Sequence, residues 1–152
     1  MKRKSINKKT VVVVSGGFDP LHVGHVRLME AAKKLGQKLV VIVNNDNWLR
    51  KKKGYVFMGE NERKEIIEAL ACVDRVILTK HPAHPTDMSV VKELRALKPD
   101  IFANGGDRTP QTSVSKENML CRTIGCKTVF NVGRGGKVQS SSWLVNAAKK
   151  QK

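Results

Sequence analysis

The chain has 152 residues, of which 40% are hydrophobic and 28% charged, so it fits one globular domain. Its net charge of +16 predicts that it attracts an anionic ligand or a polyanion. No apolar stretch reaches the roughly 20 residues that span a bilayer, and the basic start MKRKSINKKT lacks the apolar segment of a secretory signal. The three cysteines have no C-x-x-C spacing, which argues against a disulfide framework or a cysteine zinc site and predicts a cytoplasmic protein.

Apolar runs alternate with amphipathic stretches from residue 11 onward, which predicts a domain over 11–148 between basic tails at 1–10 and 149–152. The expected strands are Val11–Ser15, Leu39–Val43, Val73–Leu78, Ile101–Ala103 and Lys127–Val132. The expected helices are Val23–Leu35, Glu60–Ala71, Met88–Leu97 with Thr86 or Asp87 as its cap, Ser115–Ile124 and Ser140–Lys150. This order predicts an α/β fold, a single Rossmann-like, doubly wound five-stranded parallel sheet with helices on both faces.

The first expected strand ends in the stretch GGFDPLHVGH, residues 16–25. Gly16 and Gly17 allow a sharp turn and a close approach of the backbone to a ligand. The next helix points its first N–H groups at the same space, and His22 and His25 lie one turn apart at its entrance. Imidazoles there can donate hydrogen bonds to phosphate oxygens. A pair of structural histidines is the alternative, but this setting favours phosphate binding.

The same stretch resembles the G-x-F-D-x-x-H-x-G-H signature of the cytidylyltransferase-like nucleotidyltransferases, and the resemblance covers about residues 11–147. It implies that the phosphate of an acceptor attacks the α-phosphorus of a nucleoside triphosphate in line and that pyrophosphate leaves. His22 and His25 would be catalytic. We expect Phe18 in the core and Asp19 to brace the loop through backbone N–H groups. The nucleotide-binding residues implied in this motif are Gly16, Gly17, Phe18, Asp19 and Gly24.

A second loop is expected over 44–63, NNDNWLRKKKGYVFMGENER, after the second strand. In the resembling family a lysine of this loop contacts phosphates, and the spacing leaves Lys51 and Lys53 both open as catalytic residues. Arg63 matches a nucleotide-binding arginine at the head of the next helix, or it is a surface i,i+4 partner. Trp48 either stacks on a base or packs beneath the loop.

The last two candidate segments follow the fourth and fifth strands. NGGDR, residues 104–108, resembles a segment of the sugar-phosphate members, with Gly105 and Asp107 at the nucleotide. In GRGGKVQSSSWL, residues 133–144, Ser140, Ser141 and Ser142 take the place of a Ser/Thr-rich segment that the family sets against the β- and γ-phosphates. A plain helix cap is the alternative for these serines.

The sequence leaves open which phosphorylated acceptor is used and which base the nucleoside triphosphate carries. GQKLVVIVNND, EALACVDRVIL and NGGDR look most like the heptose-1-phosphate adenylyltransferase branch. The rival glycerol-phosphate cytidylyltransferase branch usually carries an arginine where this chain has Ala71, and flavin-adenylating relatives stay open. The expected partners are therefore ATP or CTP, a sugar-1-phosphate or polyol phosphate, and a second copy of the chain in a homodimer.

We expect Mg²⁺ to enter with the nucleoside triphosphate, held mainly by its phosphates, without a metal site on the protein. His81 and His84 of HPAHP are expected to be structural or solvent-facing rather than metal ligands. A nucleic-acid-binding module is the alternative from another class. Its basis is the +16 charge and the basic tails, and no RNA-binding motif supports it.

Overall fold

A five-stranded parallel sheet forms the centre of the molecule, with strand order β3-β2-β1-β4-β5. The structure is a computed structural model that describes residues 8–106, 115–133 and 140–151. The strands are β1 (Val11–Gly16), β2 (Lys38–Val43), β3 (Arg75–Leu78), β4 (Ile101–Gly105) and β5 (Lys127–Val132). The order reverses at β1, because the chain leaves β3 at one edge and re-enters beside β1 as β4. The predicted doubly wound fold is confirmed.

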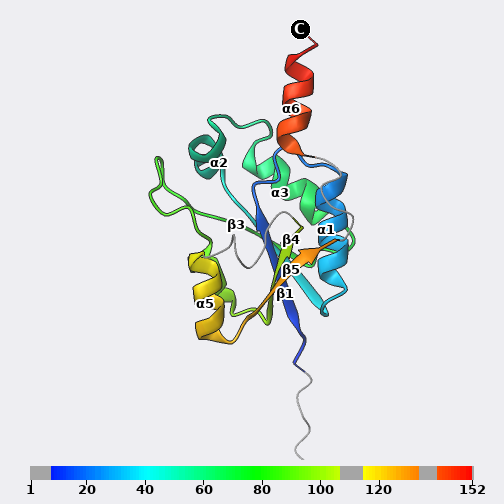
Figure 1. Cartoon of the computed structure of the whole chain (residues 1–152), viewed down its shortest axis with the longest axis vertical. Helices are drawn as coiled ribbons and strands as arrows, with labels where there is room; N and C mark the ends of the chain where they lie inside the picture. The colour runs from blue at the N-terminus through cyan, green and yellow to red at the C-terminus, as the bar shows by residue number, and fades with distance from the viewer. Residues whose placement is uncertain (1–7, 107–114, 134–139, 152) are drawn as a thin grey trace, which may run out of the picture.

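Helices cover both faces of this sheet, as Figure 1 shows. The helices are α1 (Val23–Lys33), α2 (Asp46–Lys53), α3 (Glu60–Glu68), α4 (Val91–Leu97), α5 (Lys116–Ile124) and α6 (Ser141–Lys149). Alternate residues of β1 point to opposite faces, as the strand period requires. Val14 packs with Met29 of α1 and Ile67 of α3, whereas Val13 packs with Leu94 of α4 and Leu120 of α5.

The cationic run at 50–53 belongs to a helix, so the expectation of a continuous loop over 44–63 is wrong. The side chain of Asn45 accepts a hydrogen bond from the Trp48 N–H and caps α2 at its N-terminus. Gly54, with φ +83°, ends the helix in the left-handed conformation. The four cations of Arg50–Lys53 occupy the last turn, where the helix dipole favours positive charge.

The expected cap of α4 is also wrong. The helix begins at Val91 rather than Met88, and its N-cap residue is Val90, which makes no side-chain cap bond. Asp87 instead accepts a hydrogen bond from the N–H of Ser89, two residues on, and so forms a local turn. The segment before α4 is therefore an extended connection from β3, and this connection lines the hollow described below.

Both ends of the described chain are attached to the body. Lys8 forms an ion pair with Asp100 at 3.4 Å, and the Thr10 N–H donates to the side chain of Gln37. At the other end, α6 stands beyond the end of the sheet where β1 finishes (Figure 1), and its Lys149 ammonium lies 5.7 Å from the ring centre of Tyr55. Within the described residues, none of the helices has the length and apolar character needed to cross a bilayer.

Candidate active site

Two glycines at the end of β1 allow side chains from other elements to pack against the backbone. A Cβ atom on Gly16 would lie 3.0 Å from the ring of Phe18, and one on Gly17 would lie 2.9 Å from the side chain of Leu49 in α2. Phe18 is buried and has φ +52°, so the chain turns sharply there before the cis peptide bond between Asp19 and Pro20. In this structure both glycines are needed for close packing within the protein.

His22 and His25 form a stacked pair at the entrance of α1. Their ring centres are 3.8 Å apart and their planes differ by 23°. The Nδ1 atom of His22 accepts the N–H of Gly24 at 3.0 Å, and the Nδ1 atom of His25 accepts the N–H of His22 at 3.3 Å. The two imidazoles thus make a reciprocal cap of the helix. Because each Nδ1 accepts a hydrogen bond, each neutral ring carries its proton on Nε2.

The environment of His25 keeps its ring neutral. Phe18 packs edge-on against the imidazole, with ring centres 5.0 Å apart and planes at 89°. Burial, reinforced by the neighbouring charges of His22 and Lys53, lowers the pKa of His25 from 6.5 to about 3. At neutral pH His25 is therefore a hydrogen-bond donor through Nε2 and carries no charge.

Asp19 joins the stretch 16–25, which contains His22 and His25 and is called the histidine loop below, to the segment between α2 and α3. Its two carboxylate oxygens accept the N–H groups of Phe57 and Met58, each at 2.6 Å. The residue is fully buried. Bracing through backbone N–H groups was expected, but the braced segment is 57–58 rather than the loop that contains Asp19. Both oxygens are engaged inside the protein.

Of the two lysine candidates, the structure brings Lys53 to the histidine loop. Its ammonium donates to the backbone carbonyl of Asp19 at 3.2 Å, and the residue is half-buried, whereas Lys51 is exposed on α2. Burial lowers the pKa of Lys53 from its ordinary value; the charge of Asp19 opposes this shift and that of Arg63 adds to it. Trp48 donates its indole N–H to the carbonyl of Met88 and packs near Gly17, as the packing interpretation predicts.

Arg63 is fully buried, so its interpretation as a surface partner is wrong. Its guanidinium donates to the carbonyls of Met58, Gly17 and Asn44, at 2.8, 2.6 and 2.7 Å. It also pairs with the carboxylate of Asp46 at 2.8 Å. Arg63 thus ties the ends of β1 and β2 to α2, with its donors directed into the protein. Asp46 had no recognisable role in the sequence, because its partner lies 17 residues away.

The serines at the start of α6 take three different positions. Ser141 is buried and donates its hydroxyl to the carbonyl of Pro20 at 2.8 Å, so it ties α6 to the histidine loop. Ser140 is the N-cap residue but makes no side-chain cap bond to the helix, and Ser142 is exposed. The last residue of β4 is Gly105, at the same end of the sheet, and Asp107 lies outside the described residues.

The two histidines of HPAHP lie on the connection between β3 and α4. His81 has Nδ1 2.9 Å from the hydroxyl of Thr79 and Nε2 3.1 Å from the carbonyl of Ser89, and His84 is exposed. His81 is therefore structural. Over residues 8–106, 115–133 and 140–151, the structure brings together no group of three His, Cys, Asp or Glu side chains suited to a metal ion.

The arrangement places two imidazole donors, a helix N-terminus and a lysine at the carboxyl end of β1, where the strand order reverses. A family model described as cytidylyltransferase-like matches residues 13–134. The chain belongs to the cytidylyltransferase-like family of nucleotidyltransferases.

The relatives of the chain include two kinds of protein. The chain is 41% identical over 111 residues to the bifunctional protein HldE of Syntrophotalea carbinolica, covering 72% of this chain and 21% of that protein. It is 38% identical over 122 residues to the FAD synthase of Pyrococcus abyssi, covering 80% of this chain and 78% of that protein. The chain thus spans about a fifth of its HldE relatives and most of the FAD synthase.

Solved structures of other proteins agree with this fold. A lipopolysaccharide core biosynthesis protein of Thermoplasma volcanium matches with a TM-score of 0.66 and 32% identity, covering 84% of this chain and 100% of that one. A pantoate-β-alanine ligase of Francisella tularensis matches with a TM-score of 0.64 at 18% identity, covering 97% of this chain and 71% of that one, which bears on the fold alone.

Proposed function

We propose that this chain transfers an adenylyl group from ATP to the phosphate of a small-molecule acceptor and releases pyrophosphate. The observation that carries the proposal is the stacked pair His22 and His25, whose Nδ1 atoms are both occupied by backbone N–H groups. In each neutral ring the donor is then Nε2–H, and both rings stand at a helix N-terminus that favours anions. Such a site is suited to hold phosphate oxygens.

The reaction needs charge stabilisation and positioning rather than a nucleophile on the protein. The acceptor phosphate forms a bond to the α-phosphorus while the bond to pyrophosphate breaks, and negative charge spreads over the non-bridging oxygens. Nε2–H donors of His22 and His25 stabilise that charge, and the lowered pKa of His25 keeps that ring a neutral donor. Lys53, held near the loop by the Asp19 carbonyl, adds a positive charge.

Magnesium enters this proposal as part of the ATP substrate. Both carboxylate oxygens of Asp19 accept N–H groups, and Oδ1 of Asp46 pairs with Arg63, so these acids are already engaged within the protein. The Mg²⁺ is then held by the triphosphate oxygens, and the protein contributes hydrogen-bond donors to the complex.

The FAD synthase relatives and the sequence segments both support the choice of adenine. FAD synthases, by name, build a product that contains an adenylyl group, and the sequence segments favour the heptose-1-phosphate adenylyltransferase branch. We propose a sugar-1-phosphate as the acceptor. A flavin phosphate is the second candidate, because the chain matches FAD synthase over most of that protein's length. Cytidylyl transfer to glycerol 3-phosphate is disfavoured by Ala71.

Pyrophosphate release tests the proposal directly. The full chain is incubated with each of the four nucleoside triphosphates and Mg²⁺, against heptose 1-phosphate, other sugar-1-phosphates, flavin mononucleotide and glycerol 3-phosphate. We expect release with ATP and one phosphorylated acceptor, and none when the acceptor is left out. Release with CTP and glycerol 3-phosphate alone would contradict adenylyl transfer. No release with any pair, together with salt-sensitive oligonucleotide binding, would favour the nucleic-acid-binding alternative.

A further inference from the structure

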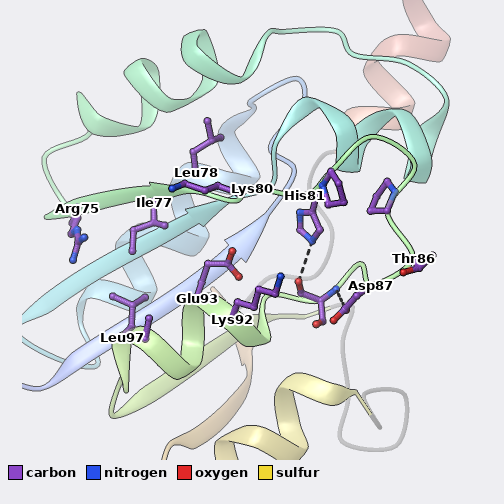
Figure 2. A pocket seen from close by; sticks show the side chains of 14 residues that line it. Arg75, Ile77, Leu78, Lys80, His81, Thr86, Asp87, Lys92, Glu93 and Leu97 are labelled. Atoms are coloured by element: carbon purple, nitrogen blue, oxygen red, sulfur yellow. Dashed lines mark hydrogen bonds between the residues drawn. The ribbon is translucent and has the colours of Figure 1, made fainter.

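A hollow of about 660 Å³ lies beside the sheet, between the edge strand β3 and helix α4 (Figure 2). The connection from Lys80 to Ser89 closes one end of it. Its volume falls within the roughly 300–1,000 Å³ of small-molecule sites. His22, His25 and Lys53 do not line it, and β2 separates β3 from β1 in the sheet. The hollow is therefore distinct from the histidine site.

The hollow arises because α4 leaves the edge of the sheet uncovered. Helix α4 has seven residues and packs through Leu94 with Val13 and Phe102, on the central strands. Strand β3 pairs with β2 on one side and forms the sheet edge on the other. Apolar side chains from both elements and from the connection line the space: Ile77, Leu78, Pro82, Pro85, Ala96 and Leu97.

Three cations, Arg75, Lys80 and Lys92, stand around this apolar lining. No ion pair engages any of them in the part of the chain that the structure describes. Asp87, one of the two acidic lining residues, already faces the ammonium of Lys116 at 3.7 Å and accepts the N–H of Ser89. The hollow thus has positive charge available for an anion.

One buried polar atom in the lining, the Oε2 atom of Glu93, has no hydrogen-bond partner within the described residues. His81 does not serve it, since its ring nitrogens lie against Thr79 and the Ser89 carbonyl. In Figure 2 the carboxylate of Glu93 points from α4 toward β3, into the hollow. A carboxylate oxygen only accepts, so the missing partner is an N–H or O–H donor.

We propose that this hollow binds a nucleotide whose base carries an amino group. The flat base lies on the apolar lining around Ile77 and Leu97, its amino group donates to Glu93, and its phosphate meets Lys80 and Lys92. A phosphorylated polyol lacks a ring and would set hydroxyl groups against prolines and leucines. A wholly apolar ligand would leave Glu93 and the cations without partners. An amino-substituted base with a phosphate matches the apolar lining, the Glu93 carboxylate and the cations together.

The test uses the full chain with labelled isoleucine and leucine methyl groups and AMP as the probe, followed by NMR. We expect AMP to shift the methyl signals of Ile77 and Leu97. This should happen whether or not the methyl signals of Leu21, which precedes His22, also shift. Glu93→Ala and Lys92→Met should each weaken this binding at least about tenfold, the size of one lost charge-assisted contact. Lys34→Met, on an exposed lysine at the end of α1, is the matched control and should bind normally.

Ligand variants test the proposal even if Glu93→Ala fails to fold. IMP carries a carbonyl where AMP has its amino group, so it should bind to the wild-type hollow at least about tenfold more weakly. Ribose 5-phosphate, which lacks the base, should leave Ile77 and Leu97 unmoved. AMP shifts confined to Leu21, or ribose 5-phosphate binding as tightly as AMP, would overturn the proposal. Because the readout is binding at named methyl groups, its outcome is separate from that of the pyrophosphate assay.

Discussion

The imidazole of His25 stacks on that of His22 with 3.8 Å between ring centres, and the two rings together cap the N-terminus of α1. This contact fixes both proton positions at once, since each Nδ1 accepts a backbone N–H. His25 is thereby held as a neutral donor beside His22 at the N-terminus of α1. Such preorganisation is a major source of electrostatic stabilisation in enzymes.

Loss of either imidazole should therefore slow the reaction. We expect His22→Ala and His25→Ala each to lower kcat by about 10²-fold or more, as for other lost transition-state donors. His22→Asn keeps a capping oxygen and removes the Nε2–H, so it separates the two roles of that residue. The measurement is steady-state pyrophosphate release by the purified full chain.

His84→Asn is the matched control for these variants. His84 is exposed and has φ +53°, a conformation that asparagine adopts more readily than alanine. Its kcat should equal that of the wild type. Near-normal rates in both His22→Ala and His25→Ala would contradict the role given to the pair.

Acid should destabilise the protein through His25. Its pKa is about 3 in the folded state, against the ordinary histidine value of 6.5 that applies to the unfolded chain. Between these values the unfolded state binds a proton that the folded state does not, so the free energy of unfolding falls as pH falls from 6.5 toward 3. Urea denaturation at pH 7 and pH 4.5 measures the effect. His25→Gln, which has no such proton to bind, should lose less stability over this interval, and an equal loss would be evidence against a neutral buried ring.

The architecture could be predicted from the sequence because its signals are local. Continuous apolar runs marked the positions of the strands, and Lys127–Val132 agrees at both ends. The helix α2 was missed because it is mostly polar, with one buried residue, Leu49. Its signals were the cap Asn45 and the terminator Gly54, which are weak beside a run of four cations.

Contacts between distant segments could not be predicted in the same way. The histidine pair was found because both members lie in one short motif, whereas Arg63 contacts Gly17, 46 residues earlier in the chain. Likewise, Asp19 braces Phe57 and Met58 rather than its own loop. Such partners depend on the packing of α2 and α3 over the strand ends. The homodimer, the cytoplasmic location and the roles of the site residues stay predictions.

The choice between Lys51 and Lys53 can be settled by matched substitutions on one helix. Lys53 contacts the histidine loop and contributes to the lowered pKa of His25, whereas Lys51 is exposed. We expect Lys53→Met to lower kcat/KM by about tenfold to 10²-fold through the lost charge near the phosphates. Lys51→Met should change it less than about twofold, as for other exposed charges. The reverse order of effects in the pyrophosphate assay would assign the phosphate contact to Lys51.

Arg63 should matter first for stability, because its donors are all directed into the protein. Arg63→Met leaves Asp46 without its ion-pair partner and removes the donors to three backbone carbonyls. Breaking a buried pair from one side costs about 3–5 kcal/mol, so we expect a loss of that size in the free energy of unfolding. Lys64→Met, on the next residue of α3, removes an exposed i,i+4 pair with Glu68 and should cost less than about 0.5 kcal/mol. Urea denaturation of both variants gives the comparison. If Arg63→Met kept wild-type stability and lost only ATP binding, the arginine would be a substrate ligand rather than a clamp on the strand ends.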